Sequence, residues 1–345
     1  MAELVDHLAE LTGFRDRELL DVTLVGALRD LLRPRPQVVA IYRSVGEPGN
    51  ERWLMRARLA SGDLAASADP SWTDIEGLPR HDQHPERCEA FRRQAIVLRA
   101  GSPSRAWFPV ATDRETLGVM EVETEAPLDE RDQRMVMSIL RIYRNFQGLL
   151  DYSERDTLTG LLNRKTFDES FMKTITQPDA AGIDAARDGR RQPAPGCRHW
   201  LGVIDIDHFK RVNDNHGHLI GDEVLLLMAR LMRGSFRLDD RLYRFGGEEF
   251  VVLMRCADAA AATLAFERLR GNVENHLFPQ VGRITVSVGF TELHAGDTPS
   301  GAFERADKAV YFAKGQGRNQ VRYHADLVAA GHLADDAKVG DVELF

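Results

Sequence analysis

The sequence is poor in cysteine. Its 345 residues include three cysteines, Cys88, Cys197 and Cys256, which lie far apart and are odd in number. Small secreted domains that depend on disulfides need several paired cysteines, so this class of protein is excluded and reduced thiols are expected.

Long apolar runs and a secretion signal are also missing. No apolar stretch approaches the roughly 18–20 residues that cross a bilayer. The N-terminus, MAELVDHLAELTG, carries acidic residues where a signal peptide has a basic start and an apolar core. We therefore expect a cytoplasmic protein with no membrane partner.

The sequence has no excess of positive charge. It holds 53 acidic against 45 basic residues, a formal net charge of −8. Proteins whose main partner is nucleic acid usually carry a basic patch, so this balance argues against such a partner. A phosphorylated small molecule is still allowed, because it needs only a local basic cluster.

The composition is that of a globular protein with room for two domains. Apolar residues make up 43% and charged residues 28%, which is ordinary for a folded chain. At roughly 100–200 residues per domain, the length allows two.

The N-terminal part is predicted to be an α+β unit, an antiparallel sheet with flanking helices. Residues 4–32 have helical apolar spacing with a break at Gly13. A long polar loop with a short helix is expected between 61 and 90. Runs typical of strands occur at 37–45, 51–60, 94–100, 104–112 and 116–124.

A long helix is predicted after Pro127 and Asp129. Its apolar residues alternate spacings of four and three, which is a heptad seam: Met135, Ile139, Ile142, Phe146 and Leu149. The helix could pack on its own domain. Our preferred interpretation is a coiled-coil dimer stalk, residues 129–155, that joins two domains.

The remaining chain alternates strands and helices. Strands are expected at 199–207 and 283–290, a hairpin at Gly246-Gly247, and helices at 221–236, 258–274 and 300–317. Residues 176–198 lack apolar periodicity and predict a flexible surface insertion. Residues 324–345 predict a poorly patterned tail.

Three acidic clusters fall at the ends of these elements. Asp205 and Asp207 close an apolar strand, and Glu248 and Glu249 follow the Gly-Gly turn. Asp222 is expected in the first turn of a helix. Each acid alone is most simply a cap or a solvated turn, but together around one sheet they favour a Mg²⁺ site with phosphate ligands.

Four motifs resemble the GGDEF domain of diguanylate cyclases. They are DTLTGLLNRKTF at 156–167, DIDHFKRVNDNHGHLIGDEVL at 205–225, RFGGEEF at 244–250 and ADKAVYFAKGQGRN at 306–319. Their order and spacing agree with the family, and GGEEF is a variant of its signature. The resemblance implies a catalytic domain at 156–323 with a nucleotidyl-cyclase-like central sheet surrounded by helices.

This resemblance implies a nucleotidyltransferase that condenses two GTP molecules into cyclic di-GMP and releases two pyrophosphates. Each domain of the family binds one GTP and two domains must meet, so a homodimer is implied. Asp205, Glu248 and the Ile206 carbonyl match the family's Mg²⁺ ligands, with Mn²⁺ as an alternative ion. Glu249 matches the position proposed as general base.

The resemblance also implies nucleotide contacts. Asn213 and Asp222 match the pair that reads guanine. Phe209 and Lys210, with the backbone around them, match the phosphate-binding turn. The other matched positions are Lys314 and Arg318 for the triphosphate and His218 for ribose or base, although His218 is equally well explained by a structural role.

Arg237 and Asp240 look like the family's RxxD inhibitory site for product. The spacing carries this assignment, because Asp240 lies six positions before Gly246. An arginine offers a forked donor to phosphate or guanine, whereas the simpler alternative is an exposed ion pair. Arg268, on the next expected helix, is a further candidate for this site without a motif behind it.

Residues 1–128 resemble a GAF sensory domain. The stretch FPVATDRETLGVMEVETEAPLDERD at 108–132, followed by the long helix, carries this resemblance. A PAS-like or other sensor sheet is the alternative. A metal or haem site is suggested by His81, His84 and Cys88. Their spacing fits no tight metal motif, and an exposed polar loop is the preferred interpretation.

The sequence therefore favours a sensor-regulated diguanylate cyclase. A catalytically silent domain that only binds cyclic di-GMP through Arg237 and Asp240 is the second hypothesis, but it would not need the matched metal ligands. A bifunctional protein with a hydrolase would need a further domain, for which we find no room.

Overall fold

The computed structural model describes residues 17–32, 35–46, 49–69, 75–111, 116–176, 197–237 and 240–334. The chain divides into two compact units, Met1–Ser153 and Glu154–Phe345. The predicted helix before residue 17 and nearly all of the predicted insertion at 176–198 lie outside the described residues. Of the helices within these ranges, none combines the length and apolarity that crossing a bilayer requires.

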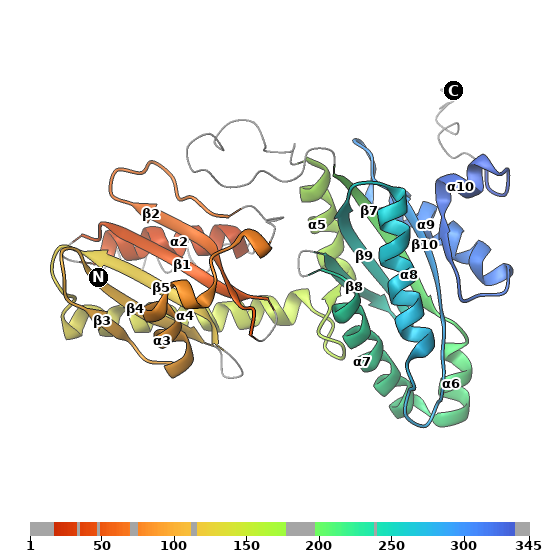
Figure 1. Ribbon diagram of the computed structural model, residues 1–345, viewed down its shortest axis with the longest axis horizontal. Helices are drawn as coiled ribbons and strands as arrows, with labels where there is room; N and C mark the ends of the chain where they lie inside the picture. The colour runs from red at the N-terminus through yellow and green to blue at the C-terminus, as the bar shows by residue number, and fades with distance from the viewer. Residues whose placement is uncertain are drawn as a thin grey trace, which may run out of the picture. The chain divides into compact units, whose positions relative to one another are not determined.

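The first unit is built on a five-stranded antiparallel sheet in the order β2-β1-β5-β4-β3, which confirms the five predicted strands (Figure 1). Along β2, buried and half-buried residues alternate, as expected for a strand with one covered face. The strands are β1 (Val38–Val45), β2 (Arg52–Ala60), β3 (Val97–Arg99), β4 (Ser104–Ala111) and β5 (Thr116–Thr124). The helical segments before and between them are α2 (Arg17–Leu31), η1 (Ile75–Gly77), η2 (His81–Gln83) and α3 (Pro85–Arg93).

Helix α4 (Glu130–Glu154) confirms the long helix but presents a different stripe to the core. Its buried residues are Val136, Ile139, Leu140, Tyr143, Gln147 and Leu150, and the apolar ones pack with α2 against the sheet of the same unit. Of the predicted seam, Ile139 is buried, and Met135, Ile142 and Phe146 are partly buried against this core. Leu149 is 65% exposed. The helix thus covers its own sheet, which is the alternative that the sequence left open beside the preferred dimer stalk.

A buried carboxylate fixes α4 on this unit. Asp21 of α2 is fully buried and accepts hydrogen bonds from the Tyr143 hydroxyl and from Arg56 Nε, the latter at 2.9 Å. Gln147 Nε2 donates to the Tyr143 hydroxyl at 2.8 Å. A buried charge is costly without such partners, and sliding α4 along the sheet would take the Tyr143 hydroxyl away from Asp21.

The segment around His81 and Cys88 is not an exposed loop, so that prediction was wrong. It forms η2 and α3, with His81 5% and Cys88 7% exposed. The His81 ring stacks on Trp53 at 3.9 Å, and burial lowers the pKa of His81. No group of three His, Cys, Asp or Glu side chains in the described ranges is placed to hold a metal ion.

The second unit is a six-stranded mixed sheet in the order β11-β10-β7-β9-β8-β6, covered on both faces (Figure 1). Residues of α6, α7 and α8 share one core with the sheet, and residues of α5 and α9 share the other. The strands are β6 (Leu162–Asn163), β7 (Arg198–Ile206), β8 (Arg241–Gly246), β9 (Glu249–Cys256), β10 (Val286–Glu292) and β11 (Val321–Tyr323). The helices are α5 (Arg164–Thr176), α6 (Phe209–His216), α7 (His218–Ser235), α8 (Ala259–Asn275), α9 (Pro299–Gly315) and α10 (His324–Ala329).

Two predictions for this unit need correction. Strand β10 begins at Val286, and its residues Val286–Thr291 are buried on both faces because α8 and α9 cover it. Gly289 makes this possible, since a Cβ there would lie 2.2 Å from the Ala306 carbonyl oxygen of α9. The predicted tail begins with α10, whose His324 and Leu327 are buried.

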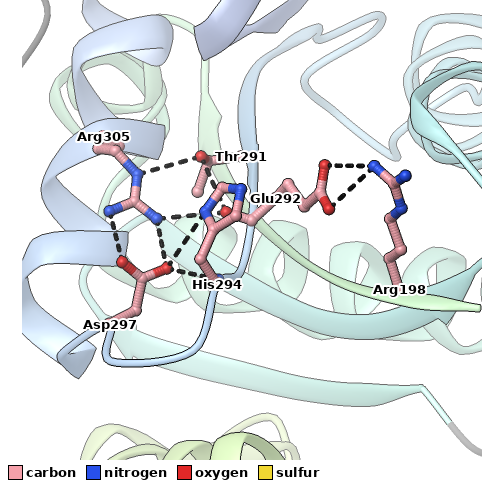
Figure 2. Close-up of polar contacts among 6 residues, drawn as sticks. All are labelled: Arg198, Thr291, Glu292, His294, Asp297 and Arg305. Carbon is pink, nitrogen blue, oxygen red and sulfur yellow. Dashed lines mark hydrogen bonds and ion pairs between the residues drawn. The ribbon is translucent and has the colours of Figure 1, made fainter. Parts of the chain in front are cut away.

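Helix α9 is anchored near its first turn by Arg305 (Figure 2). Arg305 Nη1 and Nη2 donate to the two carboxylate oxygens of Asp297 at 2.9 and 2.6 Å, and Nε donates to Thr291 Oγ1 at 3.2 Å. Beside this pair, Arg198 of β7 contacts Glu292 at 3.1 Å. Such a bidentate pair holds the start of α9 at the end of β10.

Candidate active site

Carboxylates from three elements meet at one end of the second sheet. Asp205, near the end of β7, is paired across the ladder with Glu249, the first residue of β9. Glu248 precedes it in the turn, where its carbonyl oxygen lies 3.4 Å from the Ile206 nitrogen, which donates to it. Burial raises the pKa of both Asp205 and Glu249, and the charge of Asp307 on α9 raises both further.

One oxygen of Asp205 is buried without a hydrogen bond. Asp205 is 7% exposed, and its Oδ2 lies 2.7 Å from Lys314 Nζ of α9. Within the described part of the chain, no donor bonds to Oδ1. A buried acceptor left unpaired is costly, so this oxygen is well suited to bind a cation.

The electrostatics of the cluster favour an added positive charge. Burial raises the pKa of Asp205 despite the opposing ion pair with Lys314. Burial, and then the charge of Asp205, raise the pKa of Glu248 and Glu249. Lys314 therefore offsets only part of the repulsion, and a bound cation would offset more of it.

The donor set fits a hard divalent ion that keeps other ligands. Carboxylate and carbonyl oxygens are what Mg²⁺ prefers, and Mg²⁺ usually takes one or two carboxylates together with water and phosphate. In the described ranges no three acidic, His or Cys side chains gather tightly enough to enclose a metal alone. Asp205 and one of the two glutamates match a site in which water and phosphate complete the coordination of the ion.

Asp207 differs from Asp205 although both belong to one acidic cluster in the sequence. It is 4% exposed, and its Oδ1 accepts from Ser287 Oγ at 2.7 Å. Its Oδ2 accepts from Thr285 Oγ1 at 2.7 Å and from the Asn319 backbone N–H at 3.0 Å. Both oxygens are satisfied by protein donors, so this carboxylate serves structure.

Asn213 of α6 and Asp222 of α7 lie on helices that meet at a close approach. A Cβ on Gly221 would lie 2.0 Å from Asn213 Oδ1, so glycine leaves the room that this side chain occupies. Asn213 is half-buried, whereas Asp222 and His218 are exposed. Because α7 begins at His218, Asp222 lies further into the helix than the predicted first turn.

The predicted phosphate-binding positions fall on two turns. His208, with φ of 60°, precedes α6, and the start of a helix favours anions. Phe209 is 4% exposed and packs in the core, so only its backbone could serve a ligand, whereas Lys210 is exposed. Arg318 lies in the turn after α9, with φ of 65°.

Arg237 and Asp240 are joined through the backbone. The Arg237 N–H donates to Asp240 Oδ2 at 2.8 Å, and the Asp240 N–H donates to the Arg237 carbonyl at 3.1 Å. Burial raises the pKa of Asp240 to about 6. Arg268 Nε donates to the Ser235 carbonyl at 2.8 Å, which gives this arginine a structural contact at the end of α7.

The sequence reasoning assigned no role to Asp156, Arg244 or Asp307. Arg244 Nη1 donates to Asp156 Oδ1 at 3.0 Å, and its Nη2 donates to the Gly247 carbonyl at 2.9 Å. This contact ties the DTLTG segment to the acidic turn. Asp307 could have been found from its spacing, since it precedes Lys314 by two helical turns on α9.

Comparison with known proteins gives a family match within the second unit and matches to curated relatives over about half of the chain. The family model described as "Diguanylate cyclase, GGDEF domain" matches residues 187–320. Diguanylate cyclase DgcP of Pseudomonas aeruginosa is 38% identical over 197 residues, which are 56% of this chain and 27% of DgcP. Response regulator PleD of Caulobacter vibrioides is 35% identical over 183 residues, 51% of this chain and 37% of PleD.

The chain therefore spans about a quarter to two fifths of the length of these curated relatives. Among solved structures, the GGDEF domain of DgcB from Caulobacter crescentus, in complex with c-di-GMP, is 31% identical with a TM-score of 0.43. The match covers 50% of this chain and 96% of that domain. On the family match and the identities to DgcP and PleD, the second unit is similar to the GGDEF domain of diguanylate cyclases over residues 187–320.

Proposed function

We propose that this protein is a diguanylate cyclase that condenses two GTP molecules into cyclic di-GMP and releases two pyrophosphates. The observation that carries the proposal is the buried, unpaired Oδ1 of Asp205 beside Glu248 and Glu249. A receptor that only binds product has no use for such a costly group.

Asp205, Glu248 and the Ile206 carbonyl would hold Mg²⁺ or Mn²⁺. The Ile206 side chain is fully buried, so its backbone is the part available. When bound, the ion supplies charge stabilisation at the α-phosphate and helps to deprotonate the attacking 3′-hydroxyl. Glu249 is the proposed general base, and its raised pKa suits proton transfer better than an ordinary glutamate.

The remaining residues would bind and orient the nucleotide. Asn213 and Asp222 would read guanine, because a carboxylate accepts from the N1 and N2 hydrogens that adenine does not offer together. His218 stays a candidate for the ribose or base. Lys210, Lys314, Arg318 and the backbone at Phe209 would contact the phosphates.

Turnover separates this proposal from the silent-receptor hypothesis. Purified protein with GTP and Mg²⁺ should accumulate cyclic di-GMP, whereas a receptor would bind added cyclic di-GMP and leave GTP unchanged. Binding without turnover over a range of Mg²⁺ and protein concentrations would favour the receptor.

We further propose that the protein acts as a homodimer regulated by its N-terminal unit, which we interpret as a GAF-like sensor. Helix α4 supports the dimer proposal through apolar residues outside its own core, chiefly Leu149, which is 65% exposed. A symmetric contact would use this surface twice, once from each copy.

Leu149→Glu is expected to weaken the dimer by at least about 100-fold. Burying one leucine contributes about 1.5–3 kcal/mol, and a symmetric interface would lose two. Activity per molecule should then rise with protein concentration. Leu264→Glu on α8, where the leucine is 70% exposed, is the matched control and should dimerise normally. Equal dimer affinity of the two variants in ultracentrifugation would place the interface elsewhere.

Arg237→Ala is expected to relieve product inhibition. Losing a charge-assisted hydrogen bond costs about 1.5–3 kcal/mol, or about a 10- to 150-fold weaker inhibition constant. Initial rates should stay near wild type, because Arg237 lies outside the carboxylate cluster, and inhibition should be largely non-competitive with GTP. Titration of cyclic di-GMP against both proteins measures this. Equal inhibition would reduce the motif to a surface contact.

A further inference from the structure

We propose that Asp207 is a positioning residue that holds the turn after α9, and with it Arg318, ready for the triphosphate of the substrate. This inference rests on the proposed function, which gives Arg318 its phosphate contact. It separates the work of Asp207 from that of Asp205, two positions earlier on the same strand end.

Asp207 joins three segments through one carboxylate. Its backbone N–H donates to the Thr285 carbonyl at 2.9 Å. Its side chain accepts from the hydroxyls of Thr285 and Ser287, each at 2.7 Å, at the start of β10. It also accepts from the Asn319 N–H at 3.0 Å, in the turn that follows α9.

This turn has an unusual backbone. Gly317, Arg318 and Asn319 have φ angles of 103°, 65° and 47°. Glycine adopts positive φ freely, but arginine does so rarely. Two consecutive non-glycine residues keep this conformation only where surrounding contacts hold them.

Asn319 supplies those contacts from both its backbone and its side chain. Besides the bond to Asp207, its Oδ1 accepts from Arg270 Nη1 at 2.9 Å and its Nδ2 donates to Glu274 Oε1 at 2.8 Å. The two side-chain bonds tie the turn to α8, and the backbone bond ties it to the end of β7.

Asp207 therefore sets the position of the turn relative to Asp205. Asp205 would serve the metal end of the nucleotide site, and Arg318 would serve the phosphates. Without the carboxylate of Asp207, the turn could relax out of its left-handed conformation, and Arg318 would have to be ordered on binding. The loss should fall on triphosphate binding and spare the base.

Calorimetric binding of two probes tests this. GTP with a methylene group in its α–β bridge cannot release pyrophosphate and carries the triphosphate, whereas GMP carries the base and one phosphate. Asp207→Ala should bind the GTP analogue about 10-fold more weakly and bind GMP as wild type does. Asp207→Asn should bind both nearly normally, because its amide oxygen can face Asn319 while its NH₂ donates to Ser287.

A double-mutant cycle shows whether Asp207 acts through Arg318. In an Arg318→Ala background, Asp207→Ala should cause no further loss of analogue binding. Asp297→Ala is the matched control, since it breaks the half-buried pair at the other end of α9 (Figure 2) and should leave both probes unaffected. If Asp207→Ala does not fold, Asp207→Ser keeps a small polar side chain beside Ser287, ends one bond short of the Asn319 N–H, and should show the same selective loss.

The inference is overturned if Asp207→Ala weakens the binding of the GTP analogue and of GMP equally. It is equally overturned if the effects of Asp207→Ala and Arg318→Ala on analogue binding multiply. It is also overturned if Asp207→Ser, standing in for an unfolded Asp207→Ala, binds the analogue normally. If the wild-type protein binds neither probe, the proposed function fails as well. If the wild-type protein binds both probes and turns over GTP, and Asp207→Ala binds the probes equally well, the inference fails while the proposed function stands.

Discussion

Asp205→Asn is expected to lower kcat/KM for cyclic di-GMP synthesis by at least about 1,000-fold. The substitution removes the charge that would hold a metal ion, whose charge stabilisation is worth several kcal/mol, and each 1.4 kcal/mol is about tenfold in rate. The substitution also removes the ion pair between Asp205 Oδ2 and Lys314 Nζ, which lie 2.7 Å apart. Steady-state assays with GTP and Mg²⁺ measure the loss.

The same variant should be at least as stable as wild type without metal at pH 7. Burial raises the pKa of Asp205 above its ordinary 3.8, so ionisation of this carboxyl is less favourable in the folded protein than in the unfolded chain. Wild type therefore loses stability as pH rises from about 4 through the raised pKa, and the asparagine variant does not. Mg²⁺ should raise the melting temperature of wild type alone. Near-normal turnover in a folded Asp205→Asn protein would remove the metal assignment.

The wild-type protein should prefer GTP over ATP by about 10⁴-fold, and Gly221→Ala should lose about 100-fold of that preference. Sites whose polar groups would be left unpaired reject the wrong base strongly. A Cβ at position 221 would lie 2.0 Å from Asn213 Oδ1, so Asn213 must turn away. Asn213→Ala should reproduce the effect. Competition assays with both nucleotides give the ratio.

Gly234→Ala on the same helix is the control for this prediction. Nothing lies within 4 Å of a Cβ at position 234, and alanine is a better helix former than glycine by about 1 kcal/mol. This variant should be slightly more stable and keep its preference for GTP. If Gly221→Ala kept the preference too, Asn213 would not be the base reader.

Much of the second unit was predictable because its residues have local signals. The buried strand before Asp205, the Gly246-Gly247 hairpin and the helix that carries Lys314 all follow from periodicity and turn residues. The distinction between Asp205 and Asp207 was not predictable. It depends on Ser287, Thr285 and the Asn319 N–H, which come from elsewhere in the chain.

The first unit shows where local pattern misleads. The alternating spacing of four and three residues in α4 is compatible with a dimer seam and with packing on a sheet. Most of these apolar residues pack against the core of their own unit. The polar segment around His81 has the composition of a loop. His81 is buried nonetheless, because its ring stacks on Trp53. This partner lies on β2, which the local sequence around His81 does not reveal.

The most direct test of the central claim is the stoichiometry of the reaction. Purified protein incubated with GTP and Mg²⁺ should yield a product with the mass of cyclic di-GMP and two pyrophosphates for each molecule formed. Glu248→Gln, analysed in parallel, should yield neither. Binding of cyclic di-GMP without pyrophosphate release, or equal product from Glu248→Gln, would contradict the account.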